Sequence, residues 1–238
     1  MEEISTLSRS LVSRLNALER RISGTSSSTL VRHATRNVYT WVTEYTETKN
    51  DHWVEEGRPS PYERFPKRAY IAAIFEFLGS EERVVWIEKS RDMMLSWSCV
   101  AYLLFNVMTV PQRSALFQTQ TEKKAIQLVE YAKCLYRRQH RELQAAFPLS
   151  KNIDDQSALE LNFANGSRIL GIPGGANQIR SFHPWGYLND ESSFQADAGE
   201  CFHEALSVVP GKIIFNSSAG PSWYADARRD IVRNEDNS

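Results

Sequence analysis

The feature that most constrains this chain is a set of three apolar, strand-like runs that each end abruptly in polar residues. In chain order they are 84–97 (VVWIEKSRDMMLSW), 185–193 (WGYLNDESS) and 212–220 (KIIFNSSAG). In a parallel sheet the carboxyl ends of the strands share one edge, where residues distant in sequence converge and ligands bind. A lysine, a hydroxyl, a carboxylate pair and a small polar turn at such an edge suit a magnesium nucleotide.

The sequence around these runs alternates between strand-like and helix-like segments. We predict strands at 84–88, 114–119, 185–189 and 212–216, and helices at about 94–108, 121–138, 197–207 and 222–233. Two further strand-like runs, 159–163 and 168–172, flank Asn165-Gly166, which is a strong hairpin signal. This alternation predicts an α/β fold: a mostly parallel sheet flanked by helices and joined by right-handed crossovers, with a β-hairpin insertion.

The first quarter of the chain indicates a helical appendage. Apolar residues recur there at helical spacing, at Leu7, Leu11, Leu15, Leu18 and Ile22. We favour a helix docked against the body over self-association. A flexible break at 24–29, an aromatic-rich helix at 30–45, an irregular proline-rich stretch at 57–66 and a helix at 70–78 ended by Gly79 follow. We therefore divide the chain into an N-terminal appendage with its linker, 1–57, and an α/β domain, 58–238.

Composition sets broad bounds on the class of protein. The 238 residues are 42% hydrophobic and 24% charged, as in globular proteins, and the net charge of -1 neither implies nor excludes nucleic acid. Three scattered cysteines argue against a disulfide framework and for a reducing compartment. The histidines show no zinc-site spacing, and no apolar run approaches the roughly 20 residues of a membrane span. We expect a soluble, intracellular protein.

The first run carries part of the chemistry of a phosphate-binding loop. Such a loop presents backbone N–H groups and a helix N-terminus to the anion, a lysine that neutralises it, and a hydroxyl that holds magnesium. The standard G-x-x-x-x-G-K-[ST] pattern is absent, but Lys89 opens the loop and Ser96 lies seven residues on. A strand-to-helix turn with a solvated lysine explains this segment equally well. Met93-Met94, where glycine is expected, restricts the loop to backbone angles that a side chain tolerates and argues against tight nucleotide binding.

The second and third runs supply acids and a small polar turn. An acid at a strand end, such as Asp190, holds a magnesium shell, while its neighbour Glu191 can orient and deprotonate water. Asn189 interrupts the apolar run one residue before them. An exposed turn or a helix N-cap is the simpler interpretation of the pair. The 217–220 segment (SSAG) also suits an ordinary turn, and its interest lies in its position after the acids.

Together with 173–181 (PGGANQIRS), the runs at 87–97, 190–191 and 217–220 resemble the ATPase domain of the large terminase subunit, the DNA-packaging motor of tailed phages and related viruses. In that family the phosphate loop is a deviant form whose lysine is displaced toward the strand, as Lys89 is here. The resemblance covers roughly 60–225 and lies in the ordered combination of motifs. It implies a P-loop NTPase fold of the ASCE type for 58–238, with ATP and Mg2+ as cofactors.

The resemblance also implies a role for each matching residue. Nucleotide binding falls to Lys89, Ser90, Ser96, Trp97, Ser217, Ser218 and Gly220. Among these, Lys89 contacts the phosphates, and Ser217, Ser218 and Gly220 form the motif that couples hydrolysis to movement. Ser96 and Asp190 ligate magnesium. The catalytic residues are Glu191 as base, Arg91 beside the phosphates, and Arg180, which reaches a neighbouring subunit's nucleotide.

Some assignments within the resemblance are looser. A surface salt bridge is the alternative role for Arg180. Phe65 or Tyr70 is placed where the family contacts adenine, although the glutamine often found there is missing. DNA contact would use basic residues that are otherwise a solvated helix face, namely Lys123, Lys124, Lys133, Arg137, Arg138 and Arg141.

The implied function is ATP hydrolysis coupled to translocation of double-stranded DNA into a capsid. The implied partners are DNA, a portal protein, a small terminase subunit and further copies in a ring on the portal, in the host cytoplasm and without a membrane. Because eighteen residues follow Gly220, we expect a fragment, a split gene product or a truncated form that lacks the lid and the nuclease domain. The alternatives are a helicase-like P-loop ATPase and a catalytically degenerate scaffold that binds portal or DNA.

Overall fold

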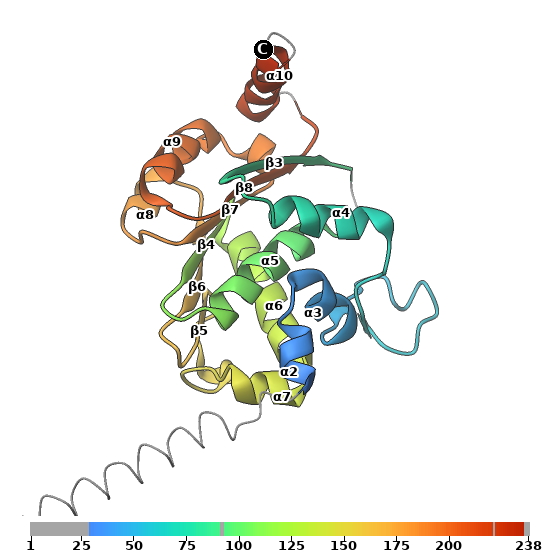
Figure 1. The fold of residues 1–238 in the computed structure, drawn as a ribbon. Helices are drawn as coiled ribbons and strands as arrows, with labels where there is room; N and C mark the ends of the chain where they lie inside the picture. The colour runs from blue at the N-terminus through green and yellow to red at the C-terminus, as the bar shows by residue number, and fades with distance from the viewer. Residues whose placement is uncertain (1–28, 91–92, 221, 236–238) are drawn as a thin grey trace, which may run out of the picture.

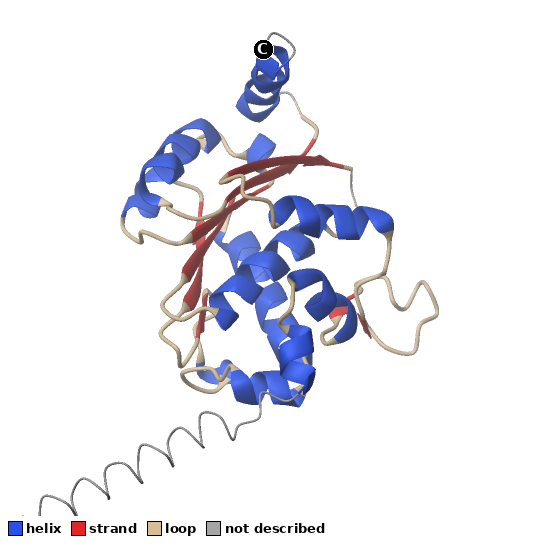
Figure 2. Cartoon of the chain, viewed as in Figure 1, coloured by secondary structure: helices blue, strands red, loops and turns tan. Residues whose placement is uncertain are grey.

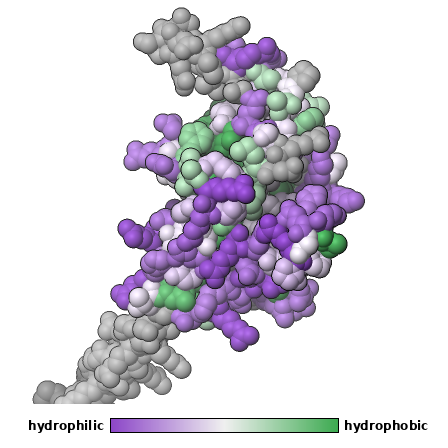
Figure 3. Space-filling view, turned by 90° about the vertical axis from the view of Figure 1, so that its right-hand side faces the viewer, coloured by the Kyte–Doolittle hydropathy of each residue, from purple (hydrophilic) through white to green (hydrophobic). Residues whose placement is uncertain are grey.

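A central sheet with helices on both faces organises the chain (Figures 1 and 2). The computed structural model describes residues 29–90, 93–220 and 222–235. The predicted apolar stripe at 7–22 and Arg91 lie outside the described residues. Among the described residues, no helix is both long and apolar enough to cross a membrane. The face shown in Figure 3 is largely hydrophilic, with small hydrophobic areas.

The sheet has six strands in the order β3-β8-β7-β4-β6-β5. The bounds are β3 Val84–Lys89, β4 Ser114–Thr119, β5 Glu160–Asn162, β6 Arg168–Pro173, β7 Gly186–Asp190 and β8 Ile213–Ser218. All neighbouring pairs are parallel except β5 with β6. The predicted α/β fold with a mostly parallel sheet is therefore confirmed, and the predicted hairpin forms one edge of that sheet.

Helices cover the two faces unequally. One face carries α5 (Leu95–Thr109) and α6 (Glu122–Arg138), and behind them α2 (Thr29–Ala34), α3 (Val38–Glu44), α4 (Ala69–Leu78) and α7 (Arg141–Ala146). The opposite face carries α8 (Ala176–Arg180) and α9 (Ala198–Val208), and α10 (Trp223–Glu235) follows β8. Short 3-10 turns lie at Ile153–Asp155 and Ser192–Phe194.

Burial on both faces explains why the strands appear as nearly continuous apolar runs. Successive side chains of β7 point to opposite faces, so Leu188 joins the core beneath α5 while Tyr187 joins the core beneath α9. Along β8, Ile214 and Ile213 divide in the same way. The sheet therefore separates two apolar cores. The polar residues that end its strands lie outside both cores, at the carboxyl edge of the sheet.

The N-terminal elements differ from the predicted single helix at 30–45. Asn37 interrupts that helix because its side chain accepts a hydrogen bond from Thr40 N at 2.8 Å and so begins α3 as an N-cap. The stretch at 57–66 is not wholly irregular, since β2 (Tyr62–Glu63) pairs with β1 (Thr48–Lys49). Trp41 of α3 is fully buried, and its ring lies 5.8 Å from that of Phe105 on α5.

Candidate active site

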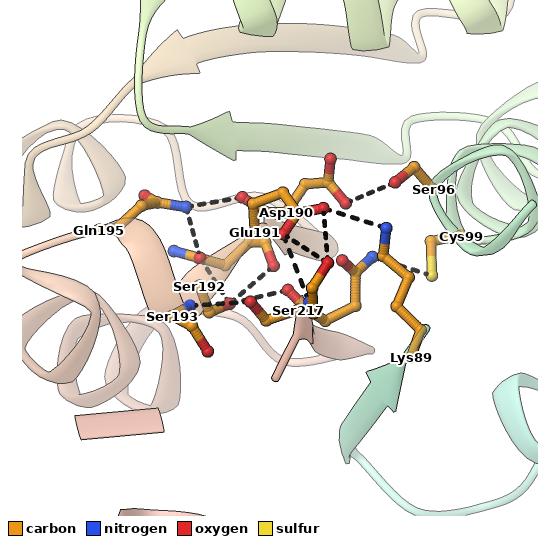
Figure 4. A network of polar contacts seen from close by, with 12 residues as sticks. Lys89, Ser96, Cys99, Asp190, Glu191, Ser192, Ser193, Gln195 and Ser217 are labelled. Atoms are coloured by element: carbon orange, nitrogen blue, oxygen red, sulfur yellow. Dashed lines mark hydrogen bonds and ion pairs between the residues drawn. The ribbon is translucent and has the colours of Figure 1, made fainter. Parts of the chain in front are cut away.

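The carboxyl ends of β3 and β7 and the first turn of α5 bring four predicted residues together (Figure 4). Lys89 Nζ lies 3.0 Å from Glu191 Oε1, and Ser96 Oγ donates a hydrogen bond to Asp190 Oδ1 at 2.8 Å. Strand β8 lies between the lysine strand and the acid strand. The small residue Ser218, which pairs with Lys89 in register, leaves the lysine free to reach across to the acid.

Glu191 is held as a carboxylate. Partial burial raises its pKa, but the ion pair with Lys89 and the hydrogen bonds from Ser218 outweigh that effect, so the pKa lies below its usual value. Ser218 N donates to Glu191 Oε2 at 3.3 Å. In this arrangement the Glu191 carboxylate is paired with the Lys89 ammonium group. Without that ion pair the carboxylate would be a stronger base.

Asp190 sits in a drier environment than its neighbour, with 8% of its surface exposed. Burial raises its pKa, and the hydrogen bond from Ser96 partly opposes this. A hydroxyl and a carboxylate oxygen side by side are the hard ligands that Mg2+ prefers. The described residues hold no cluster of three or more His, Cys, Asp or Glu side chains arranged for a metal. The donor set therefore fits a magnesium ion that takes its remaining ligands from phosphates and water.

The N-terminus of α5 opens toward the same edge. Met94 is its N-cap residue and makes no side-chain capping hydrogen bond, which leaves first-turn N–H groups available to an anion. Met94 has φ 53° and ψ 21°, in the left-handed region that favours glycine. The expectation that methionine confines this loop to ordinary backbone angles is therefore wrong for Met94.

These groups line one cavity of about 620 Å³, a size typical of ligand sites. Its wall combines predicted residues with residues of α6 and the turn after β7, namely Lys89, Ser96, Gln120, Lys124, Gln127, Leu128, Tyr131, Asp190, Glu191, Phe194, Ser218 and Ala219. Of the α6 residues, Lys124 was predicted only as a DNA contact, and Gln127, Leu128 and Tyr131 were not identified from the sequence. Their helix shows only ordinary amphipathic spacing, and no motif marks them as part of this site.

A second cavity of about 600 Å³ shares Lys89, Ser96 and Tyr131 with the first. Trp97 lines it and stacks on Tyr131, with ring centroids 4.0 Å apart. Tyr70 lines this cavity as well, whereas Phe65 is 2% exposed and packs against Phe75. Of the two residues considered for the adenine contact, Tyr70 is the one that faces open space.

The remaining predicted site residues lie around this centre. Ser90 is exposed just after β3. Ser217 is buried and accepts a hydrogen bond from Ser193 N at 3.0 Å, and a Cβ added at Gly220 would lie 3.6 Å from Ser193 Cβ. Ser217 therefore contacts the turn that carries the acids, and Gly220 lies near that turn. Arg180 does not line the cavity: it is exposed and forms a two-pronged ion pair with Glu204 of α9.

The predicted DNA-contacting residues do not form one free basic face. Lys133 is 4% exposed, and its Nζ contacts Ser157 O at 2.9 Å and Glu130 Oε1 at 3.2 Å. That prediction is wrong for Lys133, because its charge is used inside the molecule. Arg137 pairs with Asp154, the Arg138 guanidinium lies 3.3 Å from the centre of the Tyr62 ring, and Lys124 contacts Gln120. Lys123 and Arg141 are exposed.

Comparisons with known proteins find likeness in the fold. Neither a protein-family model nor a curated protein sequence matches this chain. The structure matches the HK97 bacteriophage large terminase over 85% of this chain and 42% of that one, with a TM-score of 0.62 and 10% identity. It matches the large terminase from a thermophilic bacteriophage over 71% of this chain and 44% of that one, with a TM-score of 0.51 and 14% identity. The chain thus spans less than half the length of either terminase, and the predicted resemblance is confirmed as a likeness of fold.

Proposed function

We propose that this chain is a magnesium-dependent ATPase of the large-terminase type. The observation that carries the proposal is the meeting of Lys89 with Glu191 at 3.0 Å and of Ser96 with Asp190 at 2.8 Å around one cavity. A cation, a base, and a hydroxyl–carboxylate pair are the parts that phosphoryl transfer from a nucleotide requires. The likeness to two large terminases supports the type of motor.

The first task of the site is to bind the polyphosphate. Lys89 and the uncapped first turn of α5 present positive charge and N–H donors to it. Ser96 and Asp190 would hold the magnesium ion, which neutralises charge on the phosphate oxygens. Trp97 and Tyr70 border the adjoining cavity, where the nucleoside part of ATP would lie.

The second task is to release the base at the right moment. In the ion pair, Lys89 stabilises the Glu191 carboxylate and weakens it as a base. When Lys89 turns toward a bound anion, Glu191 loses that stabilisation and its pKa rises. Glu191 can then take a proton from an attacking water. Nucleotide binding and activation of the base are thereby linked through one lysine.

The third task is to couple ATP hydrolysis to movement of the chain and of neighbouring copies. Ser217 and Ser218 contact the acid turn and Gly220 lies near it, and the three are proposed to relay hydrolysis to that movement. Arg180 is proposed to act on the nucleotide of a neighbouring copy, after leaving Glu204. Arg91 and Ser90 would complete the phosphate loop. The wider assembly we propose is a ring of copies on a portal protein, with a small terminase subunit, packaging double-stranded DNA in the host cytoplasm.

The test is turnover of ATP by the wild type and by Glu191→Gln in the presence of Mg2+. Loss of the base should lower kcat by about 10²- to 10⁴-fold while leaving ATP binding in place. Glu200→Gln, a first-turn residue of α9 that does not line the cavity, is the matched control. Equal turnover by the wild type and Glu191→Gln would contradict the proposed base.

A second candidate is a degenerate ATPase fold that serves as a scaffold for portal or DNA. Met94 in the left-handed region favours it, since a glycine there would form the same loop without strain. Calorimetric titration with ATP separates the two candidates. The ATPase binds ATP in a magnesium-dependent manner, and the scaffold does not.

A further inference from the structure

A buried asparagine lies directly beneath the proposed catalytic acids. Asn189 precedes Asp190 on β7 and is fully buried. Because side chains alternate along a strand, Asn189 shares the α8–α9 face with Tyr187, while Asp190 faces Ser96 on α5. The acids and this amide therefore lie on opposite faces of the same strand end.

The amide oxygen of Asn189 holds the turn that follows. Asn189 Oδ1 accepts hydrogen bonds from Ser192 Oγ and from Gln195 Nε2, both at 2.8 Å. Gln195 Nε2 also donates to the backbone oxygen of Asp190 at 2.8 Å. Figure 4 shows Ser192 and Gln195 on the side of the turn away from Ser96. Two side chains thus tie the far end of the turn back to the strand that begins it.

The orientation of Gln195 follows from these contacts. Its Nε2 meets two acceptors, and rotating the amide would place Oε1 against both. In the present orientation Oε1 is buried and has no hydrogen-bond partner among the described residues. A buried glutamine that leaves its own acceptor unpaired in order to donate twice is costly to retain for stability alone.

The amide nitrogen of Asn189 begins a path of hydrogen bonds toward the loop before α8. Asn189 Nδ2 donates to Tyr187 Oη at 2.9 Å, and Tyr187 Oη donates to Gln118 Oε1. Gln118 Nε2 in turn donates to the backbone oxygens of Pro173 and Gly175, at 3.1 and 3.2 Å. Donor and acceptor directions agree along the whole path. The acid turn is therefore connected to the loop that begins α8, the helix ending at Arg180.

The turn needs this support because Glu191 is strained. Its φ of 58° and ψ of 47° lie in the left-handed region, where a residue that carries a side chain is strained. Such a conformation persists when surrounding contacts over-determine it. Here Asn189, Gln195 and Ser192 supply contacts from below, and Ser217 accepts from Ser193 N on the other side.

We infer that Asn189 and Gln195 are positioning residues that aim Glu191 into the cavity and tie its turn to the loop before α8. This inference rests on the proposed function. Neither residue lines the cavity, so each acts through the backbone of Asp190 and Glu191. A displacement of about 1 Å in a reacting group can lower the rate about 100-fold.

The test compares two substitutions of buried glutamines. Gln195→Met removes the double donor beneath the acids. Gln156→Met is the matched control, because Gln156 is also buried and its Nε2 also donates to two acceptors, the backbone oxygens of Lys151 and Asn162. Gln156 lies beside β5, at the opposite edge of the sheet from β3. Steady-state ATP turnover, ATP affinity by calorimetry and thermal unfolding are measured for both variants.

We expect Gln195→Met to lower kcat about 10- to 100-fold with ATP affinity within about twofold of wild type, and Gln156→Met to leave kcat unchanged. In the nucleotide-free chain, amide exchange at Ser193 and Phe194 should accelerate in Gln195→Met only, because Phe194 N donates to Glu191 O within the turn and Ser193 N donates from the turn to Ser217 Oγ of β8. If Gln195→Met does not fold, Tyr187→Phe replaces it in the test. This variant loses only the hydroxyl that links Asn189 to Gln118, and it should also lower kcat.

Three results would overturn the inference. The first is equal kcat for the two methionine variants in an active wild-type background. The second is a loss of ATP affinity in Gln195→Met that matches its loss of kcat. The third is unchanged amide exchange at Ser193 and Phe194. A wild-type chain that neither binds nor hydrolyses ATP would instead overturn the proposed function, and the inference with it.

Discussion

Ser96 donates a hydrogen bond to Asp190 at 2.8 Å although 94 positions separate them in the chain. The bond joins the first turn of α5 to the end of β7, and it supplies a buried carboxylate with a donor. A magnesium ion bound between the two oxygens would take over that role. Removing the single oxygen atom Ser96 Oγ therefore tests whether this site binds the metal.

Ser96→Ala should weaken magnesium-dependent ATP binding by about tenfold or more, because it removes one of the two protein oxygens proposed to hold the ion. Calorimetry with and without Mg2+ measures this. Ser98→Ala is the control, because that hydroxyl bonds within its own helix, to Met94 O at 2.9 Å. Ser96→Thr keeps the hydroxyl and should retain binding. Equal affinities for Ser96→Ala and Ser98→Ala would show that Ser96 does not hold the metal.

The ion pair between Lys89 and Glu191 should stabilise the nucleotide-free chain. The side chains are 13% and 23% exposed, so Lys89→Met leaves a largely buried carboxylate without its cation. We expect a loss of about 1–3 kcal/mol in urea unfolding, below the cost of breaking a fully buried pair. Lys89→Met with Glu191→Gln should recover most of it. A double variant no more stable than Lys89→Met would contradict this account.

The same pair has a defined pH dependence. The pKa of Glu191 is lowered in the folded chain from its usual 4.5, so its contribution is present above pH 4.5 and is lost as pH falls through the lower folded value. The stability difference between wild type and Lys89→Met should therefore shrink below about pH 4.5. Urea unfolding at several pH values checks the sign, and a difference that grows toward acid would refute it.

Lys133 should behave as a structural residue. Lys133→Met leaves Ser157 O without its buried donor and should cost about 1–3 kcal/mol of unfolding free energy. Lys123→Met, an exposed change of the same charge on the same helix, should stay within about 0.5 kcal/mol of wild type. Thermal or urea unfolding compares the two. Equal stabilities would contradict the internal role of Lys133.

The three thiols should react slowly in the folded chain. Burial raises the pKa of Cys134 to about 11 and those of Cys99 and Cys201 to about 12. Because the thiolate is the reactive form, alkylation by iodoacetamide at pH 8 should be faster in urea than in buffer at all three sites. Mass spectrometry after timed labelling measures this. Labelling of folded Cys134 at the denatured rate would contradict its shielding.

Several features of the fold could be predicted because they are local. Apolar periodicity locates β3, β4, β7 and β8 to within about one or two residues, and Asn165-Gly166 marks the turn between β5 and β6. Short helices whose apolar residues show no clear repeat were not predicted. The helices α7 and α8 span six and five residues, too short to show an amphipathic repeat.

The order of lysine, hydroxyl, acids and small turn along the chain could be predicted from the sequence, as could their positions at or soon after strand ends, because the strand period and the polar residues that end each strand are local features. Which of these groups meet depends on the tertiary fold. The insertion of β8 between β3 and β7 sets Lys89 against Glu191, α6 closes the cavity with Tyr131, and burial diverts Lys133 to the interior. Those outcomes depend on strand order and on what each helix covers, which are non-local properties. Asn189 shows the difference most clearly: along the chain it interrupts an apolar run, and in the fold its amide joins the acid turn to the loop before α8.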